Sequence, residues 1–200
     1  MTFGQPAAIR MCRLKASGLL WFPAPMPSLP TFHGDALIGA LDAQRAEWKL
    51  DWPALAVELW QQSSGLNAEL SDHCLCPGAL VRTAKRGTMS CQYALIILRW
   101  IRRPPEDFLT GPVVDVGDTQ LPEAGPESRL RWNLAQLHAS LNAQRRARDL
   151  TWSALANELG CTPSRLTNLR TARLADMDLT MRITQWLGKP ARLFIQPARW

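Results

Sequence analysis

The residues best suited to chemistry are the polar side chains of the segment 163–171, which reads PSRLTNLRT. Leu166 and Leu169 are three positions apart, so in a helix both would pack inward. The amide, hydroxyl and guanidinium groups around them would then face outward. An Asn amide can pair bidentately with adenine, a Thr can donate to a base or meet a thymine methyl group, and Arg suits phosphates or guanine. These residue types make the segment a candidate surface for binding nucleic acid.

No catalytic set accompanies these residues. The chain has no Gly-rich phosphate loop, no H-E-x-x-H motif and no paired carboxylates on one predicted face, and its three His residues are scattered. His73, Cys74 and Cys76 form an HCLC run that suggests a metal site with Cys91. However, C-x-C spacing is a weak signal, and a closed zinc site needs four ligands, usually in two well-spaced pairs. We predict no enzymatic activity, no cofactor and no bound metal.

Two short helices joined by a tight turn are predicted over residues 151–171, TWSALANELGCTPSRLTNLRT. The apolar positions up to Leu159 have helical spacing. Gly160 follows the last turn, where a residue with positive φ is usually needed. Thr162 is a good N-cap and Pro163 a good first helical residue, so a second helix is expected to begin there. The segment is therefore predicted to be a helix-turn-helix.

The apolar pattern of this segment consists of Leu155, Ala156, Leu159, Gly160, Leu166 and Leu169. In these residues and their spacing it resembles the helix-turn-helix of the lambda-repressor-like (Cro/C1-type, XRE) family. The resemblance implies that the helix from Pro163 to Thr171 is a recognition helix lying in the major groove. One departure is Trp152, at a position where such repressors often carry a Gln that touches a phosphate.

The resemblance also implies roles for the outward-facing residues of the recognition helix. The base-reading face would hold Ser164, Thr167, Asn168 and Thr171. The residues for phosphates or guanine would be Arg165, Arg170 and Arg173. The alternative is a solvated helix that is merely basic.

The same pattern occurs twice in the chain. Residues 41–59, LDAQRAEWKLDWPALAVEL, align without a gap to residues 141–159, LNAQRRARDLTWSALANEL. A second match pairs Pro77 with Pro163 and continues to Phe108 and Phe194, at an offset of 86 positions instead of 100. The difference of 14 residues indicates an insertion in the first copy, within 60–76. The chain is therefore interpreted as a tandem duplication.

The first copy matches the helix-turn-helix pattern less well, because Gly78 begins its third helix and Thr83 replaces the core Leu169. Its candidate DNA contacts are Arg82, Lys85 and Arg86. More basic residues lie on or after the next predicted helix: Arg99, Arg102 and Arg103. If both copies bind, the chain is a single-chain pseudo-dimer that covers two half-sites about 34 Å apart. Otherwise the first copy serves as a scaffold or in self-association.

These patterns predict an all-α protein of two tandem lambda-repressor-like helix-turn-helix bundles. The expected division is a flexible, Pro-rich segment (1–31), a first bundle (32–109), a linker rich in Pro, Gly and acidic residues (110–128) and a second bundle (129–200). Four Trp residues are predicted to pack in the two cores rather than to stack on a ligand: Trp52, Trp100, Trp152 and Trp186.

Charge and cysteine content narrow the class of protein. The net charge is +6, and residues 129–200 hold 12 Lys and Arg against 4 Asp and Glu, whereas residues 31–110 are nearly neutral. A basic half suits a polyanionic partner. The five cysteines are odd in number and irregularly spaced, which favours reduced thiols and a cytoplasmic location. No apolar run approaches the roughly 20 residues needed to span a bilayer.

We expect a sequence-specific regulator of transcription that binds double-stranded DNA, as a homodimer or as a single-chain pseudo-dimer. It is expected to act as a repressor that occludes an operator. The alternative class is a helical protein-interaction module, such as an antitoxin-like protein that neutralises a partner. That alternative predicts DNA affinity that varies little with sequence.

Overall fold

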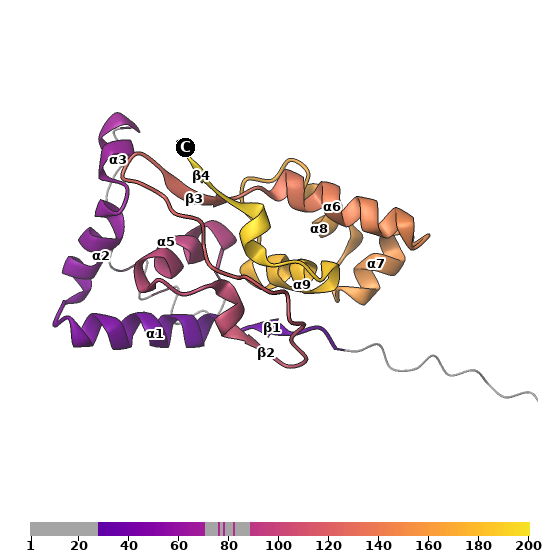
Figure 1. Cartoon of the computed structure of the whole chain (residues 1–200), viewed down its shortest axis with the longest axis horizontal. Helices are drawn as coiled ribbons and strands as arrows, with labels where there is room; N and C mark the ends of the chain where they lie inside the picture. The colour runs from indigo at the N-terminus through magenta and orange to yellow at the C-terminus, as the bar shows by residue number, and fades with distance from the viewer. Residues whose placement is uncertain (1–27, 71–75, 77, 79–81, 83–88) are drawn as a thin grey trace, which may run out of the picture.

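The computed structural model describes residues 28–70, 76, 78, 82 and 89–200, and it shows nearly the same order of elements twice (Figure 1). The first repeat contains β1 (Thr31–Phe32), α1 (Gly34–Glu47), α2 (Trp52–Gln61), α3 (Ser64–Leu70), α5 (Cys91–Ile101), the 3-10 helix η1 (Pro105–Phe108) and β2 (Leu109–Thr110). The second repeat contains β3 (Arg129–Trp132), α6 (Leu134–Ala147), α7 (Trp152–Glu158), α8 (Pro163–Asn168), α9 (Met177–Leu187), the 3-10 helix η2 (Ala191–Phe194) and β4 (Ile195–Ala198).

The prediction of an all-α fold is wrong, because the structure is mixed α/β with two small antiparallel sheets. In the first sheet β1 pairs with β2 and Phe32 lies opposite Leu109; in the second, β3 pairs with β4 and Trp132 lies opposite Ile195. These are equivalent positions of the two repeats. Each sheet thus joins the beginning of a repeat to its end. Strands of two and four residues are too short to show the alternation by which a strand is recognised in sequence.

The two repeats also share unusual backbone conformations. Lys49 and Asp149, 100 positions apart, have φ angles of 56° and 52°. Arg102 and Gly188, 86 positions apart, are the C-caps of α5 and α9, with φ angles of 53° and 61°. Non-Gly residues seldom adopt positive φ. Matching left-handed residues therefore end the same helices in both repeats.

The repeats meet through backbone groups that pair reciprocally. The amide of Cys91 donates to Ala175 O at 2.8 Å, and the amide of Met177 donates to Met89 O at 2.9 Å. These four residues form two equivalent pairs at the offset of 86, on either side of an antiparallel bridge between Ser90 and Asp176. Reciprocal contacts between equivalent residues are what a twofold axis produces in a symmetric dimer. The repeats are therefore arranged as an approximate dimer within one chain.

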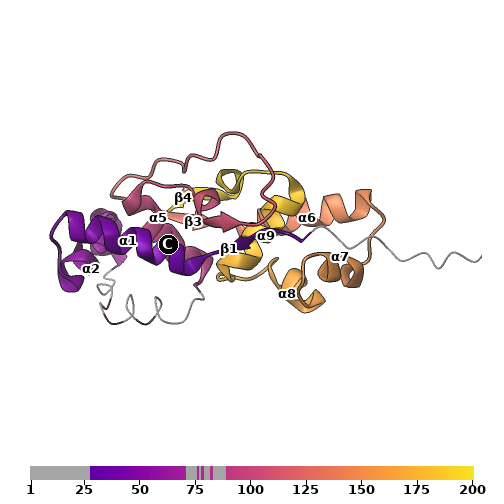
Figure 2. The ribbon, with the colours of Figure 1, turned by 90° about the horizontal axis from the view of Figure 1, so that it is seen from below.

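A second reciprocal contact fixes each first strand against the central helix of the other repeat. The side chain of Gln92, at the start of α5, accepts from Trp132 N at 3.0 Å and donates to Trp132 O at 3.3 Å. The equivalent residue of α9, Asp178, accepts from Phe32 N at 3.0 Å. Helices α5 and α9 consequently lie at the centre, while α2 and α7 lie at opposite ends (Figures 1 and 2).

In the described part of the chain, nearly all buried apolar side chains form one cluster that extends through both repeats, and the buried Leu66 lies outside it. Trp100 and Trp186 belong to this core, at 7% and 9% exposed, as predicted. Trp52 and Trp152 are only half-buried. Their rings instead lie against Arg45 and Arg145, with the guanidinium carbons 5.0 and 4.8 Å from the ring centroids. The prediction that these two Trp side chains are core residues is thus only partly right.

Helix α3 lies in the region of the 14-residue insertion and departs from the twofold pattern. Its Leu66 is fully buried, and the amide of Leu66 donates to Pro126 O at 3.1 Å. Asn67 accepts a hydrogen bond from Arg129 at the start of β3. The insertion therefore ties the first repeat to the end of the linker and to the second repeat. Among the described residues, no helix has the length and hydropathy to cross a membrane.

Cys91 offers a chemical probe of the contact between repeats. Its thiol is fully buried, and burial raises its pKa to about 11. At pH 8 only about one thiol in a thousand would be the reactive thiolate. We expect iodoacetamide at pH 8 to modify the exposed Cys76 while sparing Cys91 until the protein unfolds. Mass mapping of each cysteine tests this, and equal rates for the two thiols would contradict a closed contact.

Candidate nucleic-acid interface

Helices α7 and α8 follow one another across a short turn and contact each other at one end of the molecule (Figure 2). Thr151 caps α7, because its hydroxyl accepts from Ala154 N at 3.1 Å. Gly160 has a φ of 62° in the turn, as expected. Thr162 is the N-cap residue of α8, but its hydroxyl hydrogen bonds with that of Ser164 at 3.1 Å rather than with the backbone. The turn is held from α9 by Arg182, which donates to Leu159 O at 2.8 Å.

Helix α8, the predicted recognition helix, is shorter than the expected Pro163–Thr171. Helix α8 ends at Asn168, and Leu169 to Thr171 form a turn. Leu166 and Leu169 are buried, at 0% and 2% exposed. A six-residue helix cannot hold itself together in water, so these two contacts anchor it. All the predicted contact residues of this repeat are exposed: Ser164, Arg165, Thr167, Asn168, Arg170, Thr171 and Arg173.

In the first repeat, the structure tests little of the predicted DNA-binding segment. Arg82 is exposed, whereas Lys85, Arg86 and Thr83 lie outside the described residues. Of the three arginines predicted nearby, Arg103 donates to Asp107 at 2.8 Å, and Arg102 is exposed at the left-handed end of α5.

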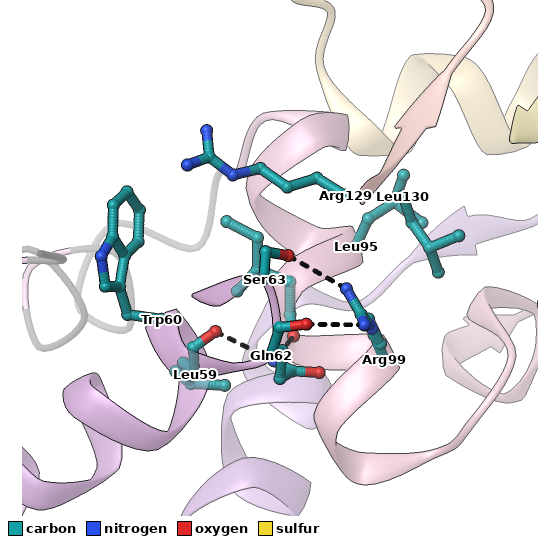
Figure 3. A pocket seen from close by; sticks show the side chains of 9 residues that line it. Leu59, Trp60, Gln62, Ser63, Leu95, Arg99, Arg129 and Leu130 are labelled. Atoms are coloured by element: carbon teal, nitrogen blue, oxygen red, sulfur yellow. Dashed lines mark hydrogen bonds between the residues drawn. The ribbon is translucent and has the colours of Figure 1, made fainter. Parts of the chain in front are cut away.

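Arg99 serves the fold rather than a binding surface. Figure 3 shows its guanidinium pointing toward Ser63 and Gln62 beside a pocket of about 20 Å³, which is space for a single water. The guanidinium donates to Gln62 O at 2.7 Å and to Ala124 O at 2.5 Å, and burial lowers its pKa. Because backbone carbonyls take its donors, Arg99 fixes the linker to the first repeat.

A larger cavity, of about 340 Å³, opens between α6 and α8 of the second repeat. We call it the α6–α8 groove; its lining residues are His138, Asn142, Arg145, Arg146, Trp152, Thr167 and Arg170. Three of these are arginines, and none of the described residues that line the groove is acidic. Arg145 is held rigidly, because its Nε and Nη2 donate to Asn142 Oδ1 at 3.1 and 2.9 Å. Asn142 is neutral, so this contact does not cancel the positive charge.

His138 lies stacked on Trp152, with ring centroids 5.4 Å apart and planes 16° from parallel. Burial and the nearby charge of Arg170 both lower the pKa of the imidazole below its usual value. The lower pKa favours the neutral imidazole, which has one hydrogen-bond donor and one acceptor. An anion in the groove would offset the charge of Arg170 and raise this pKa again.

The groove residues outside α8 were not predicted as a site. From the sequence, Trp152 is predicted to be a core residue, and His138 counts only as one of three scattered His residues. A signal was nevertheless present, since His138, Asn142, Arg145 and Arg146 are spaced at i, i+4, i+7 and i+8 and so share one helix face. Only the tertiary structure shows that this face meets α8.

The HCLC run falls largely outside the described residues, which include only Cys76 of the three. Within the ranges that the structure does describe, no group of three or more His, Cys, Asp or Glu side chains could hold a metal ion.

Comparison of the chain with protein-family models, with curated proteins and with solved structures gives no match. The resemblance to lambda-repressor-like proteins therefore remains a prediction from the residues of 151–171.

Proposed function

We propose that this protein is a regulator of transcription that binds double-stranded DNA in a sequence-specific manner through its second repeat. The observation that supports this most is the exposure of every predicted contact residue on and after α8, beside a groove lined by three arginines. An exposed helix presented on a second helix, with cations alongside, suits insertion into a major groove.

In the proposed mechanism, Ser164, Thr167, Asn168 and Thr171 face the base edges, while Arg165, Arg170 and Arg173 neutralise phosphates or pair with guanine. Phosphate contacts set the register of α8 on the duplex, and the Asn and Thr side chains supply sequence discrimination. Occupation of an operator excludes polymerase, which makes repression the expected outcome.

The test is selection from a random duplex library with the full chain at near-physiological salt. An enriched site, bound with affinity that falls steeply with salt, is the expected result. No enrichment by folded protein would contradict the proposal and favour the antitoxin-like interaction module, for which a protein partner would then be sought. Two enriched half-sites would add the first repeat as a reader, whereas a single half-site would assign reading to α8 alone.

Two substitutions separate base reading from phosphate binding. Asn168→Ala is expected to relax specificity at one base pair by about 1–3 kcal/mol of discrimination, since a bidentate Asn contact supplies that much. Arg170→Ala is expected to weaken binding to all sequences and to reduce the salt dependence by about one unit of log–log slope. Competition binding with the selected site and single-base variants measures both. An equal loss on every sequence for Asn168→Ala would count against its base-reading role.

A further inference from the structure

Several residues that line the α6–α8 groove of the second repeat are replaced at the equivalent positions of the first repeat. Equivalent positions hold His138 and Ile38, Asn142 and Asp42, and Arg146 and Ala46. Arg145 and Arg45 are retained, and both lie over the Trp that begins the next helix. The pairing of an arginine with this Trp is thus kept in both repeats, while the residues at the three other positions differ.

The charge of the retained arginine is cancelled in the first repeat only. Arg45 Nε lies 2.7 Å from a carboxylate oxygen of Asp42, forming an ion pair. Arg145 makes the corresponding contact to the neutral amide oxygen of Asn142. Both arginines also donate to a backbone carbonyl, that of Leu50 or Leu150. The two arginines therefore make equivalent contacts, but the partner of Arg45 is charged and that of Arg145 is neutral.

The second repeat adds two further cations around this fixed arginine. Arg146 follows it on α6, and Arg170 reaches the same groove from the turn after α8. In sequence, the first repeat has Ala46 and Ala84 at these two positions. Three guanidiniums around one open cavity, with His138 beside them, favour an anion that can accept several hydrogen bonds at once.

We infer that the α6–α8 groove of the second repeat binds a backbone phosphate of double-stranded DNA, and that the first repeat, with Ala46 and Ala84 at the equivalent positions, lacks this contact. The inference rests on the proposed function, because it takes duplex DNA as the partner. The inference adds that residues of α6, together with those of α8, contribute to DNA binding. The pseudo-dimer therefore binds through one end, and Arg145, Arg146 and Arg170 form its phosphate clamp.

The experiment compares the full-length wild type with Arg146→Ala and with the double variant Arg146→Ala/Ala46→Arg. The double variant keeps the net charge and moves one arginine to the equivalent, exposed position of the first repeat. Affinity for the selected duplex is measured over a range of salt concentrations. We expect both variants to bind about tenfold or more weakly and to lose about one unit of salt slope, since one charge-assisted contact is removed. A double variant that binds as tightly as the wild type would overturn the inference.

A second measurement locates the phosphate. Single methylphosphonate groups, which are uncharged, replace phosphates one at a time along the selected duplex. One position is expected to weaken the wild type while leaving the affinity of Arg146→Ala unchanged, because the contact is already missing there. If the losses of binding free energy from Arg146→Ala and from the methylphosphonate are additive at every position, Arg146 contacts no single phosphate and the clamp is refuted.

The outcomes keep this inference apart from the proposed function. If the wild type prefers one sequence and Arg146→Ala binds that sequence with unchanged affinity, only the phosphate clamp is refuted. Equal affinity of the wild type for all duplexes, with the Arg146→Ala loss intact, refutes sequence-specific regulation and leaves the clamp standing. A wild type that binds no duplex refutes both.

Discussion

Replacement of Leu166 by Ala is expected to lower the free energy of unfolding by about 2–5 kcal/mol, the usual range for a fully buried Leu. The side chain is 0% exposed, and together with Leu169 it holds α8 against the core. Because six residues do not form a stable helix alone, losing this contact should also free α8 locally. We therefore expect sequence-specific DNA binding to be lost at temperatures where the rest of the chain is still folded.

Leu174→Ala is the matched control, since Leu174 lies in the same region but is 64% exposed. Its effect on stability should stay within about 0.5 kcal/mol. Urea denaturation measures the stability of both variants, and amide hydrogen exchange in residues 163–171 reports the local opening. If Leu166→Ala binds the selected duplex as well as Leu174→Ala does, α8 is not the reading element.

Gln92→Ala is also expected to lower the free energy of unfolding strongly, because the Gln92 side chain satisfies two buried backbone groups. Its amide pairs with both the N–H and the C=O of Trp132, whose side chain is 2% exposed. Each buried polar group left without a partner costs about 1–3 kcal/mol, so the variant should lose about 2–5 kcal/mol. The effect crosses between repeats, since Gln92 belongs to the first and Trp132 to the second.

Gln61→Ala, on an exposed residue at the end of α2, controls for the loss of an amide side chain. Thermal unfolding of the two variants gives the comparison. If Gln92→Ala unfolds like Gln61→Ala, the reciprocal contacts between the repeats contribute little to stability. Iodoacetamide labelling of Cys91 in the same samples shows whether the contact between repeats has opened.

The helices that carry the candidate site could be largely predicted from the sequence, because their signals are local. Gly160 in the turn, Pro163 at the first position of α8, and the buried Leu166 and Leu169 all appear where the pattern indicated. The end of α8 was misplaced, because Arg170 and Thr171 have no strong helix-stopping character and lie in the turn that follows.

What could not be predicted depends on contacts between distant segments. The strands are short and gain their partners from the opposite end of each repeat. Helix α3 is tied to the linker through the Leu66 amide and to the second repeat through the Asn67 side chain. The α6–α8 groove combines a helix face with a turn more than twenty residues away. Its cluster of arginines is therefore brought together only by the tertiary structure and could not be predicted from the sequence.

The reciprocal pairing of Cys91 with Ala175 and of Met177 with Met89 has a consequence for how the protein behaves when it is scarce. Two separate subunits must associate before they can act as a dimer, and that dimer dissociates on dilution. Here a covalent tether replaces that encounter with an intramolecular one, whose effective concentration does not fall on dilution. If the protein binds DNA as proposed, the occupancy of its site should then rise hyperbolically with protein concentration, without the lag of an assembly step. In a homodimer one sequence sets both halves, whereas in a single chain each repeat can change independently. Asp42 and Asn142 can therefore differ although they occupy equivalent positions.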